Sequence, residues 1–225
     1  MPEKPAVTVY IDFKSPYAYL AKDPARDLER DFDISLDWLP YILDIPSYLG
    51  SARLDAAGNV IEENRNAHQW RRVRYSYMDC RRQARKRGLV IRGTQKIWDS
   101  TLAAAGMLYA KRQGPDSLHR YIDITFERFW KRELDIEDPV VIASVFAEAV
   151  GLQPTDLIRG VDTADAAVFL AGDGPREVAR ISREAEGKGV FGVPSFMLDD
   201  ELFWGSEHLP DIREVLASRS LESAR

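Results

Sequence analysis

Hydrophobic and polar positions change period along the chain, and the changes predict its elements. The apolar runs Val7–Phe13 and Ile34–Leu39 are rich in branched and aromatic residues and predict two strands. Between them, Ser15 is a residue type that caps helices and Pro16 suits a first helical position, so a helix is expected over residues 17–30. Strand, helix and strand in this order predict a right-handed parallel crossover.

The middle of the chain follows a helical period. One apolar face recurs at steps of three and four, formed by Trp70, Val73, Tyr77, Cys80 and Ala84, and Gly88 is expected to end that helix. Further helices are predicted over residues 100–112, 116–131, 139–150, 155–171 and 175–186. The segment 41–66 is expected to be irregular, with a turn at Gly58-Asn59.

Strand patterns return near the end of the chain. Residues 195–198 and 201–204 predict a hairpin that turns at Asp199-Asp200, and a last helix is expected over 207–217. The whole pattern predicts an α/β fold in which a long helical block interrupts a small strand-containing frame.

Composition and charge narrow the class of protein. Hydrophobic residues make up 45% and charged residues 30%, as in ordinary globular proteins, and the net charge of −5 disfavours binding to nucleic acid or to an anionic membrane. No apolar run approaches the roughly 20 residues of a membrane span, and the first residues lack a secretory core. The single cysteine excludes an intramolecular disulfide, so we expect a cytoplasmic protein. The three histidines are scattered, so no metal site is expected.

Three short motifs carry a family resemblance. They are the turn Ser15-Pro16-Tyr17, the loop Gly189–Pro194 and the turn Phe203–Glu207. In their order and spacing, the chain resembles 2-hydroxychromene-2-carboxylate isomerases and kappa-class glutathione transferases. The resemblance implies a discontinuous thioredoxin-like domain, residues 1–45 and 185–225, with an inserted all-helical domain of residues 65–184. It also implies a homodimer.

The resemblance also assigns residues to a glutathione site. Ser15 corresponds to the catalytic serine that hydrogen-bonds the sulfur, and Val193, before the cis-proline position Pro194, pairs its backbone with the cysteinyl part. Ser206 and Glu207 correspond to the turn that binds the γ-glutamyl end, with Glu in place of the family's usual Asp.

Three further positions depart from the family pattern or leave a choice open. Arg72 stands where the family has lysine in a Lys-x-x-Tyr motif, and His208 stands where arginine is frequent. An asparagine upstream of that motif is either Asn64 or Asn66.

The chemistry gives Ser15 a physical role. A free thiol, with a pKa of about 8.5, is mostly protonated near neutral pH, whereas the thiolate is the nucleophile. A helix N-terminus offers unpaired N–H groups and a partial positive charge, and a hydroxyl adds a charge-assisted hydrogen bond. Ser15 is therefore expected to be a donor and not a nucleophile, although the same residue also suits a plain helix cap.

The cysteine, several aromatic residues and a run of basic residues can be interpreted as structural or as functional. Cys80 is expected to be a packed core residue, and Tyr17, Tyr41, Trp38 and Trp204 suit either the core or an aromatic pocket. The ten basic residues between Arg65 and Arg92 suit a solvated helix face, with Arg72 as the candidate for clamping an anion.

The resemblance implies a function. The expected activity is a glutathione-dependent cis–trans isomerisation of a 2-hydroxychromene-2-carboxylate-like intermediate of aromatic degradation. The alternatives are conjugation of glutathione to electrophiles, as in the kappa class, and a non-catalytic thioredoxin-like protein that binds an extended peptide. A disulfide oxidoreductase is disfavoured because the 15–18 turn contains no cysteine.

Overall fold

A four-stranded mixed sheet forms the frame of the molecule. The computed structural model describes residues 4–151 and 163–223. The strand order is β2 (Ser35–Pro40), β1 (Ala6–Ile11), β5 (Ser195–Leu198) and β6 (Glu201–Trp204). The β1–β2 pair is parallel, with Val9 opposite Trp38, and the other two pairs are antiparallel. The predicted strands and the parallel crossover through α1 (Pro16–Asp31) are confirmed.

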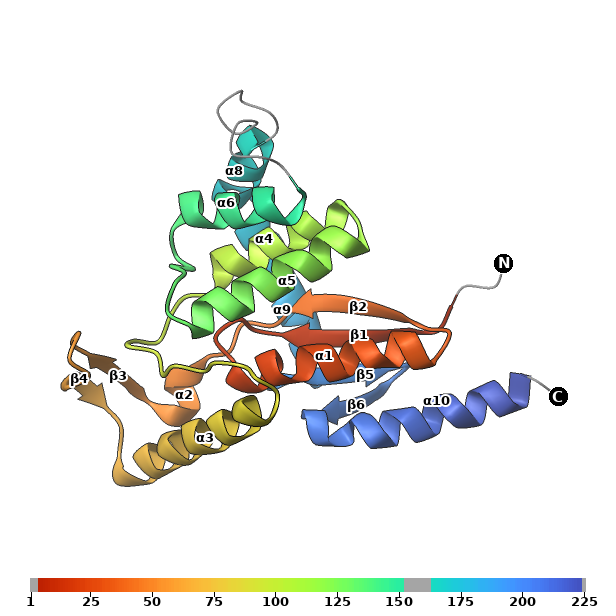
Figure 1. Ribbon diagram of the computed structural model, residues 1–225, viewed down its shortest axis with the longest axis horizontal. Helices are drawn as coiled ribbons and strands as arrows, with labels where there is room; N and C mark the ends of the chain where they lie inside the picture. Colours follow the sequence, from red (N-terminus) through yellow and green to blue (C-terminus); the bar gives the residue numbers. More distant parts are fainter. Residues whose placement is uncertain (1–3, 152–162, 224–225) are drawn as a thin grey trace.

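Helices surround this sheet. Figure 1 shows α4, α5, α6 and α8 stacked above the sheet, α9 passing behind it, α10 below it, and α1 running along the strands. The bounds are α4 (Thr101–Arg112), α5 (Pro115–Trp130), α6 (Pro139–Ala149), α8 (Thr163–Ala171), α9 (Asp173–Gly187) and α10 (Leu209–Ser223). The predicted helices are confirmed, except that the first part of the helix expected over 155–171 lies outside the described residues.

The segment 41–66 is more ordered than its pattern predicted. It contains α2 (Ile45–Leu49) and a hairpin of β3 (Ser51–Leu54) and β4 (Val60–Asn64). The β4 residues are all exposed, so the alternation that marks a half-buried strand is absent. The expected turn is present, because Gly58 has φ +90° and Asp55 accepts the Asn59 N–H at 2.8 Å. After the hairpin comes α3 (Ala67–Lys86), which Asn66 caps.

A continuous core joins the sheet to the helices above it. Trp38 of β2 and Trp130 of α5 are both fully buried and belong to one hydrophobic cluster. Phe13, just after β1, packs on Phe126 of α5 with ring centroids 4.8 Å apart. The predicted domain boundaries at residues 45, 65 and 185 stay a prediction; the last of them falls inside α9.

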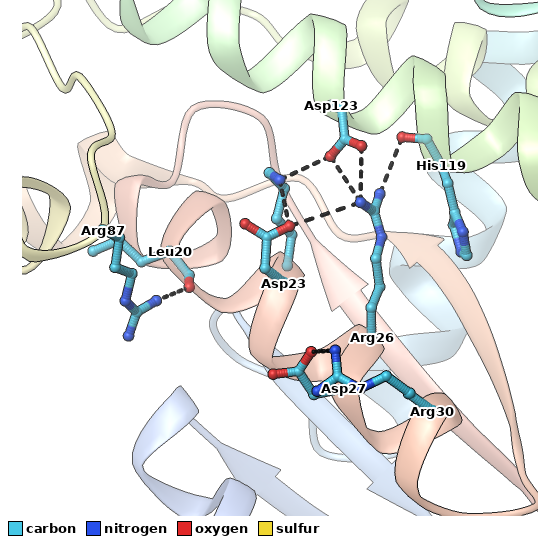
Figure 2. Close-up of polar contacts among 9 residues, drawn as sticks. Leu20, Asp23, Arg26, Asp27, Arg30, Arg87, His119 and Asp123 are labelled. Atoms are coloured by element: carbon cyan, nitrogen blue, oxygen red, sulfur yellow. Dashed lines mark hydrogen bonds and ion pairs between the residues drawn. The ribbon is translucent and has the colours of Figure 1, made fainter.

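Polar contacts fix α1 against α5. Arg26 donates from Nη1 to both carboxylate oxygens of Asp123, at 2.8 and 2.9 Å, and from Nη2 to the His119 carbonyl at 3.0 Å. Figure 2 shows Arg26 reaching from α1 between these two groups of α5. Charge-assisted hydrogen bonds are among the stronger polar interactions, so these contacts fix how α1 lies along the helical block.

A proline inside α1 creates a second contact. Pro24 lacks an N–H, so the carbonyl of Leu20, four residues earlier, loses its helical donor. The guanidinium of Arg87, just beyond α3, donates to that carbonyl, as Figure 2 shows. The contact satisfies the unpaired carbonyl and holds the end of α3 against α1.

Candidate active site

A cavity of about 570 Å³ opens at the start of α1. Its walls come from the residues before and within the first turn of α1, from α2, from α3, from segment 94–98 and from the loop before β5. The lining residues are Lys14, Ser15, Pro16, Tyr17, Leu43, Ile45, Tyr48, Leu49, Arg65, Arg72, Val73, Ser76, Tyr77, Thr94, Lys96, Ile97, Trp98, Phe191, Gly192, Val193 and Trp204. The volume lies within the usual range of small-molecule sites, about 300–1,000 Å³.

Ser15 lies at the tip of α1 and lines this cavity. Its Oγ accepts the Ala18 N–H at 3.2 Å, as a helix cap does, and donates to the Val193 carbonyl at 3.3 Å. The second bond is long for an O–H donor. The hydroxyl proton can therefore turn to a better acceptor in the cavity while the cap is kept.

The loop before β5 brings the second predicted group to the same place. The Val193–Pro194 peptide bond is cis, as the resemblance implied, and Val193 lines the cavity. A Cβ at Gly192 would lie 2.6 Å from Trp204 Nε1, so only glycine lets the Trp204 ring pack over this loop. Phe191 lies against the same ring, with centroids 4.9 Å apart.

A buried ion pair beside Ser15 was not recognised in the sequence. Lys14 is 6% exposed and its Nζ lies 3.0 Å from both the Asp12 carboxylate and Ser100 Oγ. Asp12 also accepts the N–H groups of Lys14 and Leu43. Lysine is almost never this buried without a partner. The signal available was a charged residue directly between an apolar strand and a helix cap.

The other predicted binding residues divide into two groups. Arg72 lines the cavity, but Tyr75 of the same motif is 58% exposed and lies outside its lining. Neither Asn64 nor Asn66 lines the cavity; Asn66 instead accepts the Gln69 N–H as the cap of α3.

Ser206 and Glu207 lie outside the lining, in a short 3₁₀ turn after β6 (Ser206–His208). Gly205, which precedes them, donates its N–H to the Pro194 carbonyl at 2.9 Å and so ties the turn to the proline loop. His208 contacts Asp211 at 2.9 Å. The assignment of Ser206 and Glu207 to glutathione stays a prediction.

Comparison with known proteins places this geometry in a family. The model of the DSBA-like thioredoxin domain matches residues 6–217. The chain belongs to this family. It is 30% identical over 210 residues to a 2-hydroxychromene-2-carboxylate isomerase of Sphingobium xenophagum, covering 93% of this chain and 97% of that protein.

Solved structures agree on the fold of this DSBA-like chain. A 2-hydroxychromene-2-carboxylate isomerase superposes with a TM-score of 0.71 at 20% identity, covering 97% of this chain and 98% of that one. A probable DsbA oxidoreductase of Streptomyces coelicolor gives 0.68 at 18% identity, covering 95% and 89%. The predicted thioredoxin-like fold with a helical insertion is confirmed, and the named relatives indicate an enzyme of the isomerase type.

The aromatic residues of this DSBA-like chain divide between core and cavity. Trp38 and Tyr41 are buried in the core, whereas Tyr17 and Trp204 line the cavity. Tyr17 Oη donates to Asp79 at 3.2 Å, and burial together with that carboxylate raises the pKa of Tyr17. Burial raises the pKa of Tyr48 to about 12, so the phenols of Tyr17 and Tyr48 stay protonated at neutral pH.

The single cysteine of the DSBA-like chain lies away from the cavity lining. Cys80 is fully buried on α3, and burial raises the pKa of its thiol to about 11. The expectation of a packed core residue is confirmed. Among residues 4–151 and 163–223, no helix is long and apolar enough to cross a membrane.

Proposed function

We propose that this protein is a glutathione-dependent cis–trans isomerase acting on a 2-hydroxychromene-2-carboxylate-like intermediate of aromatic degradation. The observation that carries the proposal is the meeting of Ser15 Oγ and the Val193 carbonyl in one cavity at the N-terminus of α1. The isomerase relatives support the reaction class.

The residues of the cavity fit a glutathione thiol. Ser15 is 4% exposed, so its hydroxyl would donate to sulfur in a partly dry environment, next to the partial positive charge of the helix end. Bound glutathione supplies a thiolate, the nucleophile that permits rotation about a conjugated double bond. The Ser15 hydroxyl stabilises the negative charge on the sulfur, and Val193 offers its backbone N–H and C=O groups to an extended tripeptide.

Lys14 completes the site for an anionic substrate. An ammonium group has three N–H donors. Its partners among the described residues are Asp12 and Ser100, which leaves one N–H for a group in the cavity that Lys14 lines. Burying an ion pair costs free energy that its attraction often does not recover. We therefore assign Lys14 the substrate carboxylate, with Arg72 as a second, more exposed cation.

The decisive experiment measures turnover of 2-hydroxychromene-2-carboxylate by wild-type protein and by Ser15→Ala, with and without reduced glutathione. Wild-type turnover should need glutathione, and the substitution should lower kcat/KM on the order of 100-fold, as loss of one donor to a developing anion does elsewhere. The matched control is Ser144→Ala, an exposed serine that donates to the Val141 carbonyl.

A thermal melt of Ser15→Ala separates the loss of the helix cap, about 1 kcal/mol, from the loss of chemistry. Full turnover by Ser15→Ala, or turnover of the wild type without glutathione, would refute the proposal. Accumulation of a stable glutathione adduct in place of the isomer would assign the protein to conjugation, the kappa-like alternative.

A further inference from the structure

A second cavity, of about 530 Å³, lies between the β3–β4 hairpin, α3 and segment 93–97. Figure 1 shows the hairpin and α3 beside one another, away from the sheet. Six cationic side chains line it: Arg65, Arg74, Arg81, Arg85, Lys96 and Arg132. Among the residues the structure describes, no aspartate or glutamate belongs to this lining. We call it the arginine cavity.

Backbone carbonyls hold three of these arginines in place. Arg65, Arg81 and Arg132 donate from Nε to the carbonyls of Leu49, Ile91 and Gly93, at 2.9, 3.1 and 2.7 Å. A carbonyl orients a guanidinium without neutralising its charge. The entropy of ordering these long side chains is thus already lost before a ligand arrives.

Few carboxylates compensate the charge of the arginine cavity. Lys96 is paired with Glu137, which leaves the five arginines. Glu63 accepts the Trp70 Nε1 proton at 2.8 Å, and the rings of Trp70 and Tyr77 lie against Arg65 and Arg81 instead of supplying a counter-charge. Burial lowers the pKa of Arg65, because partial desolvation disfavours the charged guanidinium.

A solvated helix face does not account for this arrangement. The cations of such a face come from one helix, whereas here residues from the end of β4, from α3 and from the loop after α5 line one hollow. Their mutual repulsion is a cost that a multivalent anion would remove.

We propose that the arginine cavity binds a small molecule that carries a diphosphate group. Guanidinium groups bind phosphate oxygens in bidentate fashion. A diphosphate carries several negative charges in a small group, whereas a carboxylate carries only one. The two cavities adjoin, so the diphosphate lies directly beside the cavity at Ser15. Six residues line both: Arg65, Val73, Tyr77, Thr94, Lys96 and Ile97.

Nucleic acid does not fit the same observations. The chain carries a net charge of −5, and the cations surround one half-open hollow instead of extending along a surface. A duplex presents its phosphates along a line and cannot enter such a hollow.

Titration calorimetry of the full chain tests the proposal without any assay of turnover, so its result is independent of the function proposed above. Inorganic pyrophosphate and ADP should bind with similar affinity, and adenosine should give no heat. The variant Arg74→Gln/Arg85→Gln should weaken pyrophosphate about tenfold, as expected for two lost charge-assisted contacts. Both side chains are exposed, so the fold should tolerate their loss.

The matched control is Arg71→Gln, an exposed arginine of α3 outside the lining, which should change the affinity less than about twofold. Absence of pyrophosphate binding, or an equal loss in the control, would overturn the proposal. Equally tight binding of citrate would overturn the assignment to phosphate. Displacement of pyrophosphate by a short DNA duplex at lower concentration would overturn the assignment to a small molecule.

Discussion

Single residues at the start of α1 combine structural and chemical tasks. Ser15 caps the helix through the Ala18 N–H and keeps a hydroxyl proton that is only weakly held by Val193. Lys14, its neighbour, is buried as an ion pair with Asp12. Under the proposed function, these two adjacent residues supply a donor to the glutathione sulfur and a cation to the substrate carboxylate, both at the rigid edge of the sheet.

Variants of the Lys14–Asp12 pair should separate its effect on the free energy of unfolding from its effect on substrate binding. Lys14→Met leaves the Asp12 carboxylate buried without its cation, and we expect a loss of about 3–5 kcal/mol in the free energy of unfolding. Asp12→Asn/Lys14→Met removes both charges and should recover a large part of that stability. Because the ammonium is still missing, the double variant should keep a raised KM for a carboxylate substrate.

Urea unfolding and steady-state kinetics measure the two effects. The control is Lys188→Met, a lysine outside the cavity lining, which should change neither quantity. A double variant with both wild-type stability and wild-type KM would assign Lys14 a purely structural role.

At the scale of elements, α1 carries a proline where a helix normally needs an N–H. Pro24 leaves the Leu20 carbonyl without its helical donor, and Arg87 replaces that donor from outside the helix. The defect in α1 therefore becomes an attachment point for the end of α3, a helix whose residues line both cavities.

A double-mutant cycle tests this attachment. Arg87→Met should lower the free energy of unfolding by about 1–2 kcal/mol, because a carbonyl loses a charge-assisted donor. In a Pro24→Ala background, the helix regains an N–H for Leu20, so Arg87→Met should cost much less. Chemical denaturation of the four proteins gives the coupling energy. Equal effects of Arg87→Met in both backgrounds would show that the two residues act independently.

At the scale of the whole molecule, the helical block and the sheet meet around buried aromatic rings. His119 of α5 packs edge-on against Trp38 of β2, with ring centroids 6.5 Å apart, and its carbonyl accepts Arg26 of α1. Burial, reinforced by the charge of Arg26, holds the pKa of His119 below its ordinary value near 6.5. The folded state therefore favours the neutral ring at this junction.

The sign of this pKa shift fixes a pH dependence. Between the folded pKa and about 6.5 the unfolded chain binds more protons, so the free energy of unfolding should fall as pH decreases through that window. His119→Gln should flatten the profile between about pH 7.5 and 5.5, whereas the exposed His68→Gln should leave it unchanged. Urea midpoints across this range provide the measurement. Identical slopes for wild type and His119→Gln would contradict the assignment.

Outside segment 41–66, the sequence by itself determined the order of the elements, the cap at Ser15 and the hairpin of β5 and β6, because each depends on contiguous residues with a clear period or turn chemistry. Short sequence motifs also indicated Ser15, Val193 and Arg72, and the fold brings these three residues to one cavity. The tertiary structure alone decided that Lys14 is buried and that Ser206 and Glu207 stand outside that lining. It also placed arginines that are spread along the chain from Arg65 to Arg132 in the lining of one cavity. The physical reason is that burial and charge pairing depend on groups far apart in the chain, whose meeting is set by packing and leaves no local pattern.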